Sequence, residues 1–171
     1  MIKEYPNFLT EDECNYIIAM SESNDLSTGR TSNKKNYGYR KAKVFWLPDK
    51  DDLVHKIRNS ISYLSEIPTE NQEGLHFVKY INGGEYKLHH DGKDRIKTAL
   101  IYLNVGYKGG ETEFPLMDRK IKPEVGKLIL WDNYYESGEK IEESKHAGLP
   151  IEFGTKYIGV IWIRNKKYEI R

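Results

Sequence analysis

The sequence is poor in the features that mark secreted and membrane proteins. It has a single cysteine, Cys14, so an intramolecular disulfide framework is excluded. No run approaches the roughly 18 apolar residues that a membrane-spanning helix needs. The N-terminus also lacks the apolar stretch of a signal peptide. We therefore expect a cytoplasmic protein without a membrane partner.

An excess of charge of either sign is missing as well. The 27 basic and 26 acidic residues give a formal net charge of +1, so no overall field favours nucleic acid or an anionic membrane. With 171 residues the chain has the length of one domain that buries a sizeable core. We expect residues 1–171 to form a single domain. The sequence does not indicate an oligomeric state.

Two helices are expected in the N-terminal part of the chain. Thr10, with Glu13 three residues later, forms a capping box, which predicts a helix from there to about Ser23. A second helix is expected to open at Pro48-Asp49 and to continue to about Leu64. Its apolar residues recur on one face, as in a helix that packs against a sheet: Leu53, Ile57, Ile61 and Leu64.

Beyond Pro68 the pattern changes to short apolar runs separated by turn signals. Strands are expected at residues 75–81, 86–91, 98–105, 111–114, 127–131 and 157–163, and at 44–47 before the second helix. About eight strands at such spacing fit a double-sheet jelly roll. The expected fold class is therefore α+β and mainly β, with a jelly-roll core supported by the N-terminal helices.

Residues 27–43 form a polar segment in which basic and aromatic side chains alternate: Lys34, Lys35, Tyr37, Tyr39, Arg40, Lys41 and Lys43. The composition predicts a loop. Basic residues among aromatics can bind single-stranded nucleic acid by stacking. A solvated loop, or a lid over a substrate, is the commoner meaning of such a segment.

The stretch from residue 80 to residue 92 holds three adjacent side chains that can each bind a metal or move a proton: His89, His90 and Asp91. If residues 86–91 are extended, His89 and Asp91 lie on one face and His90 on the other. An imidazole and a carboxylate on one face offer two ligands to a single cation. His89 and Asp91 are therefore the expected ligand pair.

A third ligand has to come from elsewhere in the chain, and His146 is the best candidate. Of the remaining histidines, His55 lies on the amphipathic pattern of the second helix and His76 in an expected strand, so both are more simply explained by packing. A His-x-Asp triplet is common by chance and carries little weight alone. The motifs around the triplet raise the probability that it is a metal site.

Those motifs follow one another in a definite order: Phe8-Leu9-Thr10, Tyr80-x-x-Gly83-x-x-Tyr86-x-x-His89-x-Asp91, Arg95-x-x-Thr98 through Asn104, Gly109-Gly110-Glu111-Thr112-x-Phe114-Pro115, Pro123-x-x-Gly126, and His146-Ala147-Gly148-x-Pro150-x-x-x-Gly154-x-Lys156. Together they resemble the iron(II)- and 2-oxoglutarate-dependent dioxygenases, in their prolyl 4-hydroxylase-like branch. The resemblance spans nearly the whole chain. The fold of that family is a double-stranded β-helix, a form of jelly roll, which agrees with the strand count.

The resemblance implies that His89, Asp91 and His146 are the Fe(II) ligands at the catalytic centre. A set of two histidines and one carboxylate leaves positions on the metal open for 2-oxoglutarate and dioxygen. It also implies that Lys156, ten residues after His146, pairs with the distal carboxylate of 2-oxoglutarate, since an ammonium adds both charge and donors. Outside this family, a lysine beside a turn would be read as a surface residue.

Further residues match positions that line the site in the family. Tyr102 and Tyr80 match the 2-oxoglutarate pocket, where a phenol can donate a hydrogen bond, although each could simply pack in the barrel. Thr98 is a weaker candidate for the same pocket. Four residues are expected around the mouth where substrate binds: Tyr86, Arg95, Trp162 and Arg164. Arg164 could equally belong to a solvated end of the last strand.

The implied activity is the hydroxylation of a prolyl residue in a peptide or protein, with dioxygen consumed, succinate and carbon dioxide released, and ascorbate as reductant. A free amino acid or another protein side chain stays open as substrate. An oxidative nucleic-acid demethylase of the same fold is suggested by the basic loop, but such relatives generally have arginine where Lys156 stands. A non-catalytic jelly-roll module is disfavoured, because the set of metal ligands is complete. The same three ligands also suit zinc, so the sequence alone does not identify the metal.

Overall fold

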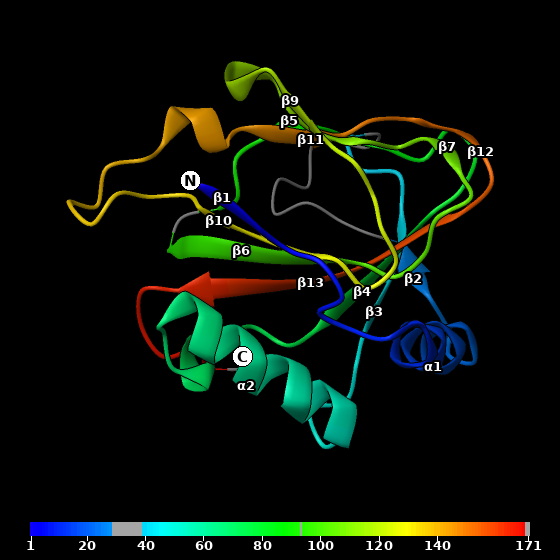
Figure 1. Ribbon diagram of the computed structural model, residues 1–171, viewed down its shortest axis with the longest axis horizontal. Helices are drawn as coiled ribbons and strands as arrows, with labels where there is room; N and C mark the ends of the chain where they lie inside the picture. Colours follow the sequence, from blue (N-terminus) through cyan, green and yellow to red (C-terminus); the bar gives the residue numbers. More distant parts are fainter. Residues whose placement is uncertain (29–38, 93, 170–171) are drawn as a thin grey trace.

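The computed structural model describes residues 1–28, 39–92 and 94–169. Two helices pack on one face of a large sheet, and a smaller sheet covers its other face (Figure 1). No helix in these ranges is long and apolar enough to cross a membrane. The layers therefore enclose two separate interiors, one on each face of the large sheet.

The large sheet has seven strands in the order β1-β10-β6-β13-β4-β3-β2. Their bounds are β1 (Ile2–Tyr5), β2 (Ser27–Thr28), β3 (Lys43–Trp46), β4 (His76–Tyr80), β6 (Arg95–Tyr102), β10 (Leu128–Asp132) and β13 (Lys156–Arg164). All their pairings are antiparallel. The longest pair, β13 with β6, forms the centre of the sheet.

The smaller sheet has the order β5-β11-β8-β9, and a separate two-stranded ribbon pairs β12 with β7. The strands are β5 (Tyr86–His89), β7 (Lys108–Gly109), β8 (Thr112–Phe114), β9 (Arg119–Ile121), β11 (His146–Gly148) and β12 (Ile151–Phe153). Short 3₁₀ helices, η1 (Thr69–Asn71), η2 (Pro115–Met117) and η3 (Glu142–Ser144), join these elements. Seven strands match expected ones, five in the large sheet (β3, β4, β6, β10 and β13) and two in the small sheet (β5 and β8).

The described residues nevertheless form more strands than expected, up to β13. The additional ones are mostly two or three residues long, too short for a period of two to show in the sequence. The predicted strand over residues 86–91 is also too long, because β5 ends at His89 and Asp91 lies beyond it. The longer strands lie within a few residues of their predicted positions.

The first helix, α1 (Glu11–Glu22), confirms the capping box, since the Thr10 side chain accepts from the Glu13 amide and the Glu13 carboxylate accepts from the Thr10 amide. The predicted start of the second helix, α2 (Asp52–Ser65), is wrong by about a turn. Asp51 is its N-cap, and its carboxylate accepts from the amides of Leu53 and Val54 in the first turn. Asp49 instead binds the guanidinium of Arg58 at 2.8 Å.

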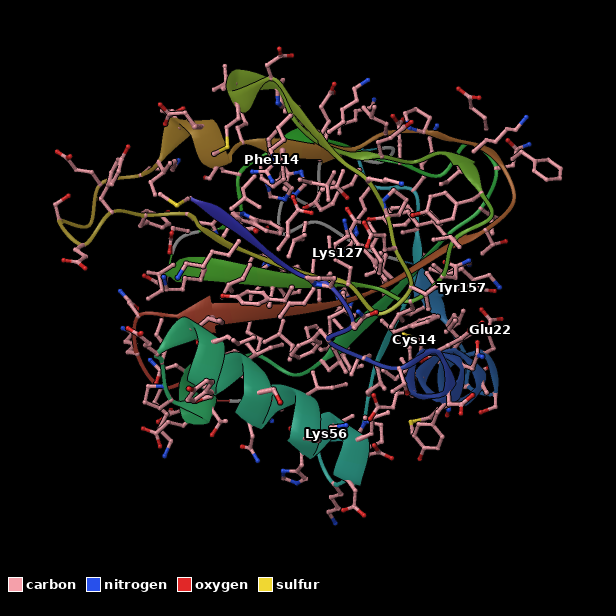
Figure 2. All side chains as sticks on the ribbon, in the orientation of Figure 1. Cys14, Glu22, Lys56, Phe114, Lys127 and Tyr157 are labelled. Carbon is pink, nitrogen blue, oxygen red and sulfur yellow. The ribbon has the colours of Figure 1, made fainter. Side chains whose placement is uncertain are left out.

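Alternation along the central strands separates the two cores, and side chains fill both spaces (Figure 2). On β6, Ala99 and Ile101 face the helices, whereas Leu100 and Tyr102 face the small sheet. The same alternation places Lys156 of β13 on the inner face, because it is in phase with the inner residues of that strand. Side chains from this inner face, from the small sheet and from the segment after β5 meet in the space between the two sheets.

The predicted loop over residues 27–43 is partly replaced by strands at its ends, β2 and β3. Lys34, Lys35 and Tyr37, on which the nucleic-acid interpretation rested, lie outside the described residues. Arg40 forms an isolated antiparallel bridge with Tyr86 at the start of β5. This bridge brings Arg40 to the edge of the inner core.

Candidate active site

The structure brings His89, Asp91 and His146 together between the two sheets. His89 ends β5 and His146 begins β11, and the two residues are paired across these antiparallel strands. Nε2 of His89 lies 3.9 Å from Oδ1 of Asp91, and Nε2 of His146 lies 4.0 Å from Oδ2. One potential ligand atom from each residue lies within 4.8 Å of the others. These atoms can converge on one cation.

The two imidazoles are oriented by the backbone. Nδ1 of His89 lies 2.7 Å from the carbonyl oxygen of Lys87, and Nδ1 of His146 lies 2.9 Å from that of Ser144. A carbonyl can only accept, so Nδ1 carries the proton and Nε2 presents a lone pair to the cluster. Burial lowers the pKa of His89 to about 3, which keeps its ring neutral and able to bind a metal.

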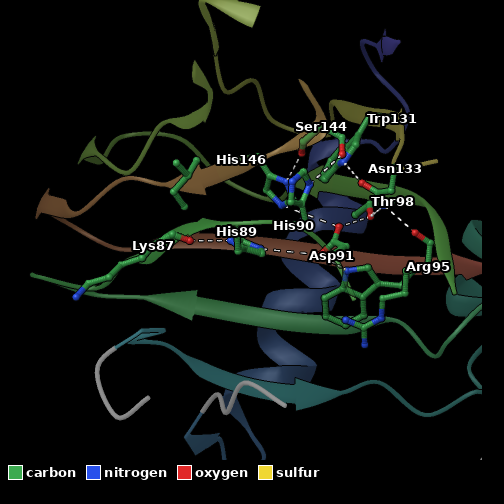
Figure 3. A network of polar contacts seen from close by, with 12 residues as sticks. Lys87, His89, His90, Asp91, Arg95, Thr98, Trp131, Asn133, Ser144 and His146 are labelled. Carbon is green, nitrogen blue, oxygen red and sulfur yellow. Dashed lines mark hydrogen bonds and ion pairs between the residues drawn. The ribbon is translucent and has the colours of Figure 1, made fainter. Parts of the chain in front are cut away.

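The carboxylate of Asp91 is held by two side chains of the large sheet (Figure 3). Thr98 donates its hydroxyl to Oδ2, and the indole of Trp162 donates to Oδ1 at 3.1 Å. Asn133 in turn donates to the Thr98 hydroxyl at 2.9 Å and accepts from the Trp131 indole, also at 2.9 Å. This chain of hydrogen bonds fixes both oxygens of the buried carboxylate.

The charge of Asp91 follows from the same contacts. Burial alone would raise the pKa of this carboxyl, but the two neighbouring histidines and the Thr98 hydrogen bond outweigh it and lower the pKa below the usual value. The group is therefore ionised at neutral pH. One carboxylate and two neutral imidazoles form a donor set suited to a divalent transition metal with open coordination positions.

The Thr98→Val protein tests this support. It keeps the side-chain volume but removes the donor to Asp91, so we expect the affinity for a divalent metal to fall roughly 10- to 100-fold. Titration of the apo-protein with Zn²⁺ measures this affinity. Thr112→Val is the matched control, because Thr112 is equally buried, on β8 of the small sheet, but contacts Lys156 instead. Equal metal affinity in the Thr98→Val and wild-type proteins would contradict the role of Thr98.

A cavity opens beside the cluster, and Lys156 lies on its wall. The Lys156 side chain is almost completely buried, with Nζ 2.6 Å from the Gly110 carbonyl oxygen and 3.4 Å from the Thr112 hydroxyl. Within the described residues no carboxylate forms an ion pair with it. Burial lowers its pKa to about 8, so the ammonium still predominates at neutral pH. A buried, unneutralised ammonium beside a metal cluster fits an anionic ligand.

The tyrosines predicted for this pocket both lie near Lys156. Its Nζ is 5.6 Å from the ring centre of Tyr80 and 5.7 Å from that of Tyr102. Tyr80 lines the cavity, whereas Tyr102 is not among the lining residues. The buried Tyr102 hydroxyl has no hydrogen-bond partner in the described part of the chain. Burial raises the pKa of Tyr102, so this phenol stays a neutral donor. Thr98, a weaker candidate for this pocket, lines the cavity and also donates its hydroxyl to Asp91.

A second hollow adjoins the cavity and shares Arg40, Tyr86, Asp91 and Trp162 with it. We call this second hollow the groove. The Tyr86 ring stacks on His89 with 3.5 Å between ring centres, and burial raises the Tyr86 pKa to about 12. Two of the predicted mouth residues, Tyr86 and Trp162, thus lie where cavity and groove meet.

The predicted arginines of the mouth are held by one buried acid, Glu73. Arg95 binds Glu73 through two nitrogens at 2.7 and 2.8 Å, and its guanidinium lies 3.8 Å from the centre of a Trp162 ring. Arg164 binds Glu73 at 2.8 Å. Arg95 lines the groove, but Arg164 does not, so Arg164 lies away from its expected position. Arg164 is instead held by its ion pair with Glu73, the same acid that binds Arg95.

His90 points away from the cluster, as predicted from the alternation of a strand. Its Nε2 lies 3.3 Å from the carboxylate of Glu142, and its Nδ1 lies 3.5 Å from the Ser144 hydroxyl. The rings of His89 and His146, by contrast, lie 4.3 Å apart. The choice of His89 over His90 therefore agrees with the geometry.

Sequence reasoning missed several residues of the site. Three of them belong to no sequence motif, and their contacts form only when distant segments of the chain come together: Glu73, Asn133 and Trp46. His76 was interpreted as packing, and it does stack on Trp46 with 4.2 Å between ring centres, but it also lines the groove. Arg40 was considered only as part of the basic loop. Its position beside Tyr86 is set by an isolated bridge that no local pattern predicts.

A profile described as the 2OG-Fe(II) oxygenase superfamily matches residues 75–164, which include all three residues of the cluster and Lys156. The chain is 28% identical to prolyl 4-hydroxylase 2 of Arabidopsis thaliana, over 96% of this chain and 67% of the plant protein. It is 29% identical to prolyl 4-hydroxylase subunit alpha-1 of Rattus norvegicus, over 90% of this chain and 31% of the rat protein.

A solved structure shows the same arrangement of the chain. The viral collagen prolyl hydroxylase vCPH from Paramecium Bursaria Chlorella virus-1, crystallised as a 2OG complex, matches with a TM-score of 0.78 and 26% identity. The match covers 95% of both chains. It confirms the jelly-roll fold expected from the sequence.

Proposed function

Because this chain belongs to the 2OG-Fe(II) oxygenase superfamily, we propose that it hydroxylates a prolyl residue of a peptide or protein. It is an oxidoreductase of the 2-oxoglutarate-dependent dioxygenase type. Relatives that match nearly its whole length are prolyl 4-hydroxylases, which supports proline as the target and does not favour the nucleic-acid or binding-module alternatives. The observation that carries the proposal is one cavity that joins the metal-type cluster to the unneutralised Lys156.

In this proposal His89, Asp91 and His146 hold the iron. Two neutral Nε2 atoms and one fixed carboxylate are the donors that suit Fe(II) with positions left open. Lys156 takes the distal carboxylate of 2-oxoglutarate, with the Thr112 hydroxyl and the Tyr80 ring beside it. The donors of these residues therefore fit both groups.

Fe(II) with 2-oxoglutarate, when bound, supplies the oxidising chemistry, in which a substrate C–H bond gains one oxygen atom of dioxygen and 2-oxoglutarate gives succinate and carbon dioxide. The chain's own residues orient the reactants and exclude water. Tyr86 covers one face of the His89 ring, and Trp162 covers Asp91 from the groove side. The substrate prolyl residue enters from the groove, because the groove meets the cavity beside Asp91.

We also propose roles for the residues around the cluster. Tyr86, Arg95 and Trp162 line the path of the substrate, and Arg164 acts on it only through Glu73. Tyr102 donates to the bound cosubstrate through its hydroxyl, which has no partner among the described residues. Ascorbate as reductant and a cytoplasmic location stay predictions from the sequence.

The proposal is tested by incubating the protein with Fe(II), ascorbate and 2-oxoglutarate, with and without a panel of proline-containing peptides. We expect succinate formation to rise with at least one peptide, and that peptide to gain the mass of one oxygen atom on proline. Succinate formed without any modified proline would overturn the prolyl assignment. No succinate under any condition would overturn the oxygenase activity itself.

A further inference from the structure

The groove beside the metal cluster has a marked charge pattern. Two arginines line it, Arg40 and Arg95, and its only lining carboxylate in the described part of the chain is Asp91. Asp91 faces the cluster and is already held by Thr98 and Trp162. The substrate side of the groove is therefore cationic although the whole chain carries a formal net charge of only +1.

The two arginines differ in how they are compensated. Arg95 is engaged by both carboxylate oxygens of Glu73, which Arg164 also shares. Arg40 forms no ion pair with the described residues, and its buried Nε has no hydrogen-bond partner among them. Its guanidinium lies 4.9 Å from the ring centre of Tyr86, so the planar group is stacked in place. An oriented guanidinium without a counter-ion is suited to bind a carboxylate through two parallel hydrogen bonds.

Arg40 also lies at the junction between the groove and the cavity. It lines both the cavity that holds the cluster and the groove that leads to it. A group bound to Arg40 would thus lie next to the reacting residue rather than far along the substrate. The wall formed by Trp46 and His76 is different in character, because Trp46 is 48% exposed and stacks on an imidazole that burial holds neutral. That wall offers the substrate apolar contacts, so Arg40 is the charged side chain available to bind a polar group of the substrate.

We propose that Arg40 is a specificity-determining residue that binds a carboxylate of the substrate next to the hydroxylated residue. This inference rests on the proposed function, since it takes the groove as the substrate path. The carboxylate can come from an aspartate or glutamate beside the target proline, or from the α-carboxylate of a C-terminal proline. Both present the same planar anion to the guanidinium.

The test compares four fluorescent peptides that differ only in charge. One has glutamate next to proline and its twin has glutamine; one ends in proline as the free acid and its twin as the amide. We expect at least one acid to bind roughly 10- to 100-fold more tightly than its neutral twin, the range for a charge-assisted hydrogen bond. Which pair shows the preference tells the side-chain source from the terminal one. The preference should shrink as salt rises.

The Arg40→Gln protein should bind the acid and its twin within about twofold of each other, because the charge is lost. Arg40→Lys keeps the charge without the planar fork and should retain part of the preference. Arg119→Gln is the matched control, since Arg119 lies on β9 and binds Glu4, away from the groove. It should keep the full preference. Thermal unfolding of each variant verifies that it is folded.

Several outcomes would overturn the inference. Equal binding of acid and neutral peptides by the wild-type protein would do so. An Arg40→Gln protein that still prefers the acidic peptide, but needs a higher concentration of 2-oxoglutarate, would also overturn it. Arg40 would then bind the cosubstrate and not the substrate. Single-stranded DNA that displaces the acidic peptide from the wild-type protein, and no longer binds to Arg40→Gln, would show that the groove binds the phosphates of nucleic acid.

Binding and product are measured on the same peptides, which separates this inference from the proposed function. If acid and neutral peptides gain oxygen on proline equally well, the prolyl hydroxylase activity is supported and the carboxylate-binding role of Arg40 is wrong. If the acids bind through Arg40 but no proline is modified, the carboxylate site stands and the prolyl assignment falls.

Discussion

The His146→Ala protein is expected to lose 2-oxoglutarate-dependent succinate formation by about 1,000-fold or more. Losing one hydrogen bond to a metal ligand already costs roughly 10- to 100-fold in metal affinity or activity, so losing a ligand costs more. The remaining pair, His89 and Asp91, would offer a cation only two protein donors. Initial rates of succinate formation and the metal content per chain measure the effect together.

Two other histidine substitutions are the controls. His55→Ala removes an exposed histidine of α2 and should leave both readouts within about twofold of wild type. His90→Ala should keep the metal, because His90 contacts Glu142 and Ser144 rather than the cluster. A His146→Ala protein with wild-type activity would show that the ligand set is wrong. Loss of metal in His90→Ala would show that the wrong histidine of the pair was assigned.

The second large effect is expected from Lys156→Met, which keeps most of the side-chain length and removes the charge. A charge-assisted hydrogen bond is worth about 1.5–3 kcal/mol, so the KM for 2-oxoglutarate should rise by roughly 10- to 100-fold. The maximal rate at saturating 2-oxoglutarate should change much less, because Lys156 lies on the cavity wall and is not part of the metal-type cluster. Succinate formation as a function of 2-oxoglutarate concentration separates the two quantities.

The same lysine predicts a pH dependence. Its pKa is lowered to about 8 by burial, so the ammonium that binds the cosubstrate is present below that pH and lost above it. The KM for 2-oxoglutarate of the wild-type protein should therefore rise about tenfold from pH 7 to pH 9, one decade per pH unit beyond the pKa. In Lys156→Met the KM should stay flat over this range.

Lys127→Met is the matched control for Lys156→Met, because Lys127 is also a buried lysine but binds Glu4 and Glu124. Its loss should lower stability and leave the KM for 2-oxoglutarate unchanged. A normal KM in Lys156→Met, or an equal rise in both variants, would remove Lys156 from the cosubstrate site.

The sequence was most informative where a local pattern has a local cause. The capping box at Thr10 predicts the start of α1 because both of its hydrogen bonds lie within four residues. The long strand β13 is predicted because its apolar run is buried on both faces. The start of α2 was missed because two aspartates compete for the cap, and only the structure shows that Arg58 occupies Asp49.

The site was predictable to the extent that spacing along the chain carries it. The cluster of His89, Asp91 and His146 follows from a two-residue spacing plus one distant histidine, and the structure brings all three together. The position of Arg164 was not predictable, since it depends on a buried acid, Glu73, more than ninety residues earlier in the chain. Arg40 was equally hidden, because its place depends on an isolated bridge to Tyr86.

If this chain is a prolyl hydroxylase, oxidation of 2-oxoglutarate is coupled to hydroxylation of proline. Succinate and hydroxyproline are quantified in the same reaction, with Fe(II) supplied and with a peptide that the panel identifies as a substrate. We expect equal amounts of the two products from the wild-type protein and neither product from His146→Ala. Succinate without hydroxyproline, or hydroxyproline formed equally well by His146→Ala, would contradict it.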